Sequence, residues 1–338
     1  MTQNHAGNRE GSIPSAGTIL PKRKTSTVDT NKFQPLTFLF LIIINLNLKK
    51  EDIMSLLKKD DKVGIVACSN GQPLLHKERI NELLEVLKSM NLIPICSDYI
   101  YAKNSVFNGL AKDKGDAFMS LYKNPGIKAI FDISGGDLAN EVLPYLDYDF
   151  ISKNPKPVFG YSDVTTVLNA INSQSSIPTY LYQIRNLIYN FKDIQQINFK
   201  NSIFNDKNDL FNFSYKFIQG SKLNGIVVGG NIRCLLKLAG TKYMPDFTGK
   251  VLFLESMGGD AALMSAFLNQ LKQIGVFEKI NGLILGTFTK MEENNISPSI
   301  CELVLSIINN PNIPIVKTDE IGHSSNSKSI IIGKHIML

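Results

Sequence analysis

A serine on a sharp predicted turn is the first candidate for chemistry in this sequence. The segment FGYSD (159–163) joins a short apolar run to a helical pattern that begins near Val164. A serine there would present its hydroxyl at the carboxyl edge of a sheet, beside the free N–H groups of a helix N-terminus, which stabilise a developing oxyanion. The segment lacks the second glycine of the G-x-S-x-G pattern. Two interpretations therefore stay open: Ser162 is a nucleophile, or Ser162 or Asp163 only caps a helix.

A pair of glycines follows another predicted strand. Gly135 and Gly136 stand at the end of the run IKAIFDISGG (127–136). Glycines let the backbone approach a ligand closely and direct its N–H groups toward it. The segment predicts either a ligand-facing loop or an ordinary tight turn.

One carboxylate and one histidine also stand at the ends of predicted strands. Glu255 ends the apolar run VLFLE (251–255), and His323 follows Gly322 in a polar loop. Serine needs a base to lose its proton, and the base needs a carboxylate to fix its tautomer. The alternatives are a salt-bridged carboxylate and an exposed loop histidine. Among the four histidines, His323 has the best placement, so the predicted chain order is Ser–Glu–His.

The elements that must position these residues alternate between strand and helix. Short β-branched runs begin at residues 62, 92, 127 and 157, and amphipathic patterns lie between them. This alternation predicts an α/β fold with a parallel, doubly wound sheet. A second block from residue 223 repeats it, and Ser297 is expected to cap its helix at 298–310. We therefore predict an N-terminal α/β domain over 62–185, a connector over 186–222 and a smaller C-terminal α/β domain over 223–338, with the site between the domains.

Composition excludes several classes of protein. The chain of 338 residues is 43% hydrophobic and 20% charged, as in globular proteins, and its net charge of +6 forms no dense basic stripe with aromatic residues. Nucleic-acid binding is therefore not expected. The four cysteines form no C-x-x-C pair, and the sequence has no Walker loop, no dinucleotide G-x-G-x-x-G and no H-E-x-x-H helix.

Residues 1–53 differ from the rest of the chain. A polar stretch rich in Ser, Thr, Asn and Gly precedes the apolar run 36–46, which is shorter than the about 20 residues that span a bilayer. We interpret 1–53 as a disordered or non-native extension, with Met54 as the natural start. A membrane or export signal and an additional packed element are the alternatives.

Four segments together resemble one family. They are SGGDLANEVLPYLDYDFI (134–151), PKPVFGYSDVTTVLNAI (155–171), GIVVGGN through VLFLE (225–255) and PIVKTDEIGHSS (314–325). In this order, over roughly residues 62–335, the sequence resembles the LD-carboxypeptidase family of serine peptidases, which includes the microcin C self-immunity enzymes.

The resemblance implies a function and roles for these residues. Ser162 would be the nucleophile, His323 the general base and then acid, and Glu255 the carboxylate that orients it. The N–H groups of Asp163 and of the Gly135–Gly136 turn would form the oxyanion hole. The implied fold is a flavodoxin-like N-terminal domain with a smaller C-terminal domain. The implied activity is release of the terminal D-alanine from murein tetrapeptides during peptidoglycan recycling, by a cytoplasmic homodimer without metal or cofactor.

Two alternatives to this function stay open. One is a microcin C-type immunity hydrolase that cleaves a peptidyl-nucleotide, and the other is a non-catalytic module that binds murein peptides. The chain departs from the family at TYLYQ (179–183), where a His-Gly-Pro turn is usual, and ends sooner than many members. It contains no tryptophan, which disfavours stacking on a nucleotide base.

Overall fold

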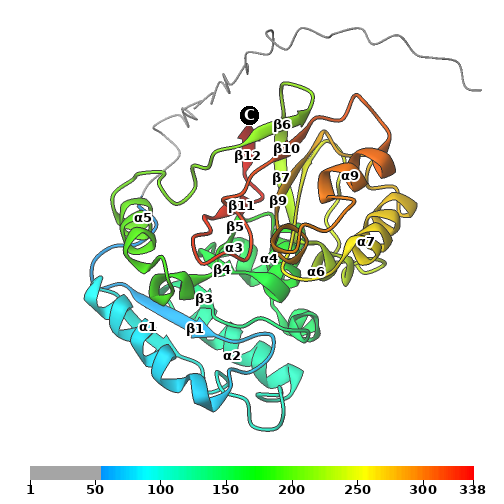
Figure 1. Ribbon diagram of the computed structural model, residues 1–338. Coiled ribbons are helices and arrows are strands. Elements are labelled where there is room, and N and C mark those ends of the chain that lie inside the picture. The colour runs from blue at the N-terminus through cyan, green and yellow to red at the C-terminus, as the bar shows by residue number, and fades with distance from the viewer. Residues whose placement is uncertain (1–54) are drawn as a thin grey trace, which may run out of the picture. The chain divides into compact units, whose positions relative to one another are not determined.

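The computed structural model describes residues 55–338, which form two six-stranded sheets with helices around them (Figure 1). The predicted extension over 1–53 and the predicted start at Met54 lie outside the described residues. Both sheets have parallel strands at their centre; the first has an antiparallel strand at one edge, and the second has one at each edge.

The first sheet has the strand order β11-β5-β4-β3-β1-β2. Its strands 1 to 5 are parallel, in the flavodoxin-like order 2-1-3-4-5, whereas β11 pairs antiparallel with β5. The N-terminal fold is therefore as predicted. The strands are β1 (Lys62–Val66), β2 (Ile93–Cys96), β3 (Ile127–Asp132), β4 (Val158–Gly160), β5 (Thr179–Leu181) and β11 (Ile330–Ile332). The α-helices of this half are α1 (Lys77–Ser89), α2 (Ala111–Lys123), α3 (Tyr148–Lys153), α4 (Thr165–Ser175) and α5 (Lys192–Phe204), and the 3-10 helices are η1 (Leu74–His76), η2 (Ala139–Tyr145), η3 (Ser162–Val164) and η4 (Ile184–Ile188).

The second sheet has the strand order β12-β7-β8-β9-β10-β6, in which β7 to β10 are parallel. The strands are β6 (Lys216–Gln219), β7 (Asn224–Asn231), β8 (Val251–Ser256), β9 (Gly282–Phe288), β10 (Ile315–Lys317) and β12 (His335–Met337). The helices are α6 (Ile232–Leu236), α7 (Ala261–Gln273), α8 (Thr289–Glu293) and α9 (Ile300–Ile308). Strands β8 and β9 are buried along their whole length, as their continuous apolar sequences require.

The range 186–222 has more structure than the predicted connector. Helix α5 packs Phe199 and Ile203 into the core beside the first sheet, while β6 pairs with β10 at the edge of the second. The residues of this range show little periodicity because α5 buries only four of its residues. The predicted cap of α9 was wrong: Ser299, not Ser297, caps this helix, because its hydroxyl and the Glu302 carboxylate form a reciprocal capping box.

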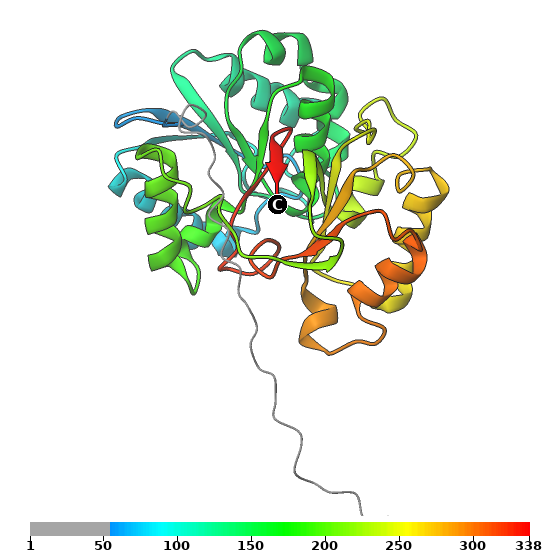
Figure 2. The same cartoon turned by 90° about the horizontal axis from the view of Figure 1, so that it is seen from above.

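Helix α4 connects the two sheets. Every residue from Thr165 to Ile171 is buried, and the helix packs against β5 of the first sheet and β7 of the second. It lies near the centre of the ribbon, between β4 and α6 (Figure 1). Seen from above, the red C-terminal segment lies between the blue-to-green half and the yellow-to-orange half (Figure 2). Because α4 follows directly after Ser162, the predicted nucleophile is held where the two halves meet.

Candidate active site

Ser162 lies on a strained turn between β4 and α4. Its φ is 54°, in the left-handed region that residues other than glycine seldom adopt. Tyr161 before it is extended, and Thr165 after η3 is helical, so the chain reverses direction within a few residues. Such strain persists only where the surroundings enforce it, and it concentrates at functional positions. The geometry is that of the sharp strand-to-helix turn expected from the sequence.

The loop after β3 lies beside this serine. A Cβ built on Gly135 would stand 3.7 Å from the Ser162 Oγ. Gly136 has a φ of 131°, and any side chain there would collide with Asn70, so the loop requires glycine. Within residues 55–338, the Gly135 and Gly136 N–H groups donate no hydrogen bond. They are therefore free to bind an oxyanion.

The buried Asp132 carboxylate fixes the start of the Gly135–Gly136 loop. It accepts hydrogen bonds from the Cys68 N–H at 2.9 Å and from the N–H and hydroxyl of Ser134 at 2.8 and 2.6 Å. Burial raises the pKa of Asp132, although these donors oppose the rise. The same bonds tie the ends of β1 and β3 together.

Glu255 and His323 are in direct contact. The Glu255 Oε2 lies 2.5 Å from the His323 Nδ1, and the two side chains are 2% and 7% exposed. Glu255 stands on β8, and His323 stands on the loop after β10. The preceding Gly322 has a φ of 152°, and a side chain at this position would collide with Thr287. Burial by itself would lower the pKa of His323, but the charge and hydrogen bond of Glu255 outweigh it, and the pKa is raised.

One cavity of about 730 Å³ brings the predicted residues together. Ser162, Gly135 and Gly136 line it from the first half of the chain, and His323 from the second, with Glu255 behind the imidazole. The His323 Nε2 has no hydrogen-bond partner within the described residues, and the ring lies 5.3 Å from that of Tyr161. No hydrogen bond joins Ser162 to His323 in residues 55–338. Catalytic hydrogen bonds are often long without substrate.

The side chain of Asp163 has a structural role that is separate from the predicted donation by its N–H group to an oxyanion. Its buried carboxylate accepts hydrogen bonds from the Ser69 hydroxyl at 2.7 Å, the Ala139 N–H at 2.8 Å and the Lys237 Nζ at 2.5 Å. Lys237 also donates to the Asp137 carbonyl at 2.8 Å. The side chain of Asp163 thus ties the nucleophile turn to the glycine loop and to the second half of the chain.

Three cations near the cavity were not identified from the sequence. Arg233 pairs with Asp137 and donates to the Gly136 carbonyl at 2.9 Å, so Arg233 and Lys237 hold the glycine loop from the second half. Arg185 lines the cavity from η4. In the sequence, only their positions point to a role near the site. Arg233 and Lys237 follow the Gly-Gly-Asn turn, and Arg185 follows the segment 179–183 that departs from the family.

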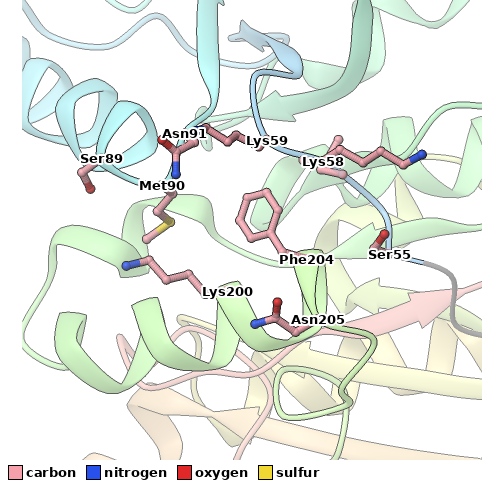
Figure 3. A pocket seen from close by; sticks show the side chains of 10 residues that line it. Ser55, Lys58, Lys59, Ser89, Met90, Asn91, Lys200, Phe204 and Asn205 are labelled. Carbon is pink, nitrogen blue, oxygen red and sulfur yellow. The ribbon is translucent and has the colours of Figure 1, made fainter.

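A second cavity, of about 540 Å³, lies away from this site (Figure 3). Lys58 and Lys59 approach it from the segment before β1, Met90 from the end of α1, and Lys200 and Phe204 from α5. Histidine, cysteine and carboxylate side chains are absent from its described lining. Its described lining therefore offers no carboxylate–imidazole pair.

Residues 55–338 contain neither a cluster of metal ligands nor a helix suited to span a membrane. No three His, Cys, Asp or Glu side chains in this range group as metal ligands. None of its helices combines the length and the apolar character needed to cross a bilayer.

Comparison with known families gives two matches in sequence order. Residues 63–182 match the LD-carboxypeptidase N-terminal domain, and residues 224–338 match the LD-carboxypeptidase C-terminal domain. The first match contains Ser162 and the glycine pair, and the second contains Glu255 and His323.

Individual relatives divide between two activities. The chain is 25% identical over 307 residues to the microcin C7 self-immunity protein MccF of Escherichia coli, covering 81% of this chain and 89% of that protein. It is 24% identical over 290 residues to a probable murein peptide carboxypeptidase of Bacillus subtilis, covering 82% and 88%.

Solved structures of both kinds share the fold. The structure of MccF in complex with glutamyl sulfamoyl guanosine aligns with a TM-score of 0.74 at 22% identity, covering 83% of this chain and 93% of that one. The muramoyltetrapeptide carboxypeptidase of Oxalobacter formigenes aligns with a TM-score of 0.66 at 20% identity, covering 82% and 94%. The predicted two-domain α/β class is confirmed.

Proposed function

The chain belongs to the LD-carboxypeptidase family, and on this premise we propose that it is a serine-type carboxypeptidase that releases the terminal D-alanine of murein tetrapeptides. The observation that carries the proposal is the 2.5 Å contact between Glu255 and His323 in the cavity that Ser162 lines. A buried carboxylate–imidazole pair beside a serine on a strained turn is suited to acyl transfer.

The proposed reaction has two acyl-transfer steps. His323 Nε2 accepts the proton of the Ser162 hydroxyl as the oxygen attacks the scissile carbonyl, while Glu255 holds the Nδ1–H and stabilises the imidazolium. The N–H groups of Asp163 and of the Gly135–Gly136 turn bind the oxyanion. The C–N bond breaks, His323 protonates the departing D-alanine, and water then hydrolyses the acyl-enzyme through the same base.

A direct assay tests this proposal. Purified protein incubated with murein tetrapeptide is expected to yield tripeptide and D-alanine, measured by mass spectrometry. Ser162→Ala is expected to lower kcat at least about 10³-fold, because no other group replaces the nucleophile. Ser89→Ala, a serine at the second cavity (Figure 3), is the matched control and should retain activity. Absence of tripeptide with the wild-type protein, or full activity in Ser162→Ala, would contradict the proposal.

A second candidate is hydrolysis of a peptidyl-nucleotide antibiotic. The sequence identity to MccF, 25%, is as high as the 24% identity to the murein peptide carboxypeptidase, which supports this second candidate function. The absence of tryptophan argues against an indole that stacks on a base, although Tyr161 and Tyr189 line the cavity. Expression in a microcin C-sensitive strain separates the two candidates, since only the second predicts protection.

The resemblance also supports a setting for the enzyme. We propose a cytoplasmic homodimer that acts in peptidoglycan recycling. Light scattering measures the mass of the particle, and cell fractionation measures the compartment.

A third candidate, a binding module without turnover, predicts that a serine-directed phosphonate does not label the protein.

A further inference from the structure

Arg185 is held rigidly at one wall of the site cavity. Its Nη1 donates to the Gln72 Oε1 at 3.1 Å, and its Nη2 to the Tyr161 Oη at 3.0 Å. The guanidinium carbon lies 5.9 Å from the ring centres of both Tyr161 and Tyr189. The Gln72 amide is itself fixed, because its Nε2 donates to the Ile133 carbonyl at 3.1 Å. The guanidinium is therefore oriented before any ligand arrives.

The charge of Arg185 is not neutralised by the residues around it. Its partners are amide and phenol oxygens, and no carboxylate in residues 55–338 lies within 4.0 Å of it. Its Nε is buried without a hydrogen-bond partner in this part of the chain. Arg233 in the same cavity differs, because Asp137 pairs with it. A half-buried guanidinium without a counter-charge is costly unless an anion binds it.

The position of Arg185 relates it to the reacting centre. The Tyr161 Oη and the Ser162 Oγ lie 3.6 and 3.7 Å from the point where a Cβ would stand on Gly135, so the two oxygens are at most 7.3 Å apart. Arg185 donates to that same Tyr161 oxygen. Successive carbonyl carbons of a peptide are about 3–4 Å apart. These limits are compatible with one residue, and a hydrogen bond at its far end, between the serine hydroxyl and the guanidinium.

We propose that Arg185 binds the terminal carboxylate of the peptide substrate and thereby confines cleavage to the last peptide bond. The inference rests on the proposed carboxypeptidase function and adds a specificity-determining residue to it. A planar guanidinium matches a carboxylate with two parallel hydrogen bonds, which the ammonium of lysine does not reproduce.

The test compares peptides that differ only at the carboxyl terminus. Wild-type enzyme is given the murein tetrapeptide with a free terminal carboxylate, the same peptide ending in D-alaninamide, and a tetrapeptide amidated only at a side-chain carboxylate. We expect kcat/KM to fall about 10- to 100-fold for the terminal amide alone, the range for hydrogen bonds to a charged group. Arg185→Met should remove this preference, mainly through KM, and Arg185→Lys should restore part of it.

The ratio between substrates isolates carboxylate binding from a structural defect. A variant that merely misplaces Tyr161 would slow all three peptides equally and leave the ratio unchanged, which would overturn the inference. Arg79→Met is the matched control, because Arg79 lies 5.8 Å from the other contact of Arg185, the Tyr189 ring, but does not line the site cavity. Selectivity for the side-chain carboxylate instead of the terminal one would also overturn it.

Binding distinguishes failure of this inference from failure of the proposed function. Calorimetry with Ser162→Ala measures the affinity for the free and the amidated tetrapeptide without turnover. If the wild-type protein cleaves no tetrapeptide but Ser162→Ala binds the free acid at least about 10-fold more tightly than the amide, the proposed activity is rejected and the role of Arg185 is supported. Cleavage with no dependence on the terminal carboxylate, or no carboxylate-dependent binding, rejects Arg185 as the anchor.

Discussion

The His323 imidazole is subject to two opposing influences. Burial disfavours the charged ring, while the Glu255 carboxylate favours it through its charge and a 2.5 Å contact. The carboxylate has the larger net effect, and the pKa of His323 lies above its ordinary value of 6.5. A general base must be neutral to accept a proton. Activity should therefore fall as the pH drops through this raised pKa.

The variant Glu255→Gln tests this balance. Burial then acts without the carboxylate, so the acid limb of the kcat/KM profile should move from above pH 6.5 to a lower pH. The kcat at the optimum should fall about 10³- to 10⁴-fold, because the imidazole loses the group that fixes its tautomer. The measurement is a pH–rate profile of both proteins. Glu292→Gln, which removes a carboxylate paired with Lys317 outside the cavity, should leave the limb in place; an unmoved limb in Glu255→Gln would contradict the assignment.

The side-chain amide of Asn169 joins helix α4 to strand β7 with the same two hydrogen bonds that a neighbouring strand would make. The Asn169 amide donates to the Gly229 carbonyl at 2.8 Å and accepts from the Gly229 N–H at 2.9 Å. Strand β12 pairs with β7 over Asn224–Ile226, and the backbone of Lys334 and Gly333 extends this pairing to Val227. Asn169 then satisfies Gly229, farther along the same edge of β7. The buried edge of β7 is therefore satisfied by a helix of the other half.

Replacing Asn169 by alanine should destabilise the protein without touching the site cavity. Each buried backbone group left without a partner costs roughly 1–3 kcal/mol, so we expect the free energy of unfolding to fall by about 2–4 kcal/mol. Denaturant titration measures the change. Asn172→Ala, on the same helix and with one hydrogen bond to Ile177, is the control and should cost about 1 kcal/mol. Equal losses in the two variants would refute this account.

The two halves of the molecule share a core. One continuous hydrophobic cluster includes Phe118 and Val167 beside the first sheet and Val228 and Leu252 of the second. The C-terminal segment contributes to both sheets, because β11 pairs with β5 and β12 with β7. The sequence domains are thus not separate packing units, and the halves should unfold together.

Two tryptophan reporters test this expectation, since the chain has no tryptophan of its own. Phe204→Trp reports on the core beside the first sheet, and Phe217→Trp on strand β6 of the second. We expect coincident denaturant transitions by fluorescence in both variants, matching circular dichroism of the wild type. Two separate midpoints would mean that the halves unfold independently.

Sequence reasoning reached the candidate trio because those residues stand at the ends of strongly apolar strands. Ser162, Glu255 and His323 each follow or end such a run. Within each sheet the parallel strands bring their carboxyl ends to one edge, and helix α4 connects the two sheets. Arg185 was beyond this reasoning, because its importance depends on the absence of a nearby carboxylate, which only the fold reveals.

Long-range pairing was equally hidden. The local pattern of III (330–332) indicates a strand but does not indicate that it belongs to the first sheet. The residues near Asn169 in the sequence likewise do not indicate that Gly229 is its hydrogen-bond partner. The segment NEVLPYLD (140–147) forms most of the 3-10 helix η2, with Pro144 inside it. Local patterns thus predicted most elements, and tertiary contacts decided the rest.

The placement of β11 and β12 has a consequence for synthesis on the ribosome. Until residues 330–337 leave the exit tunnel, β5 and β7 each lack an outer partner. A nascent chain halted near residue 320 would carry both open edges, and such edges recruit strands from other chains. The emergence of residues 330–337 therefore closes both sheets, and slow elongation before that point would lengthen the interval in which nascent chains need a chaperone.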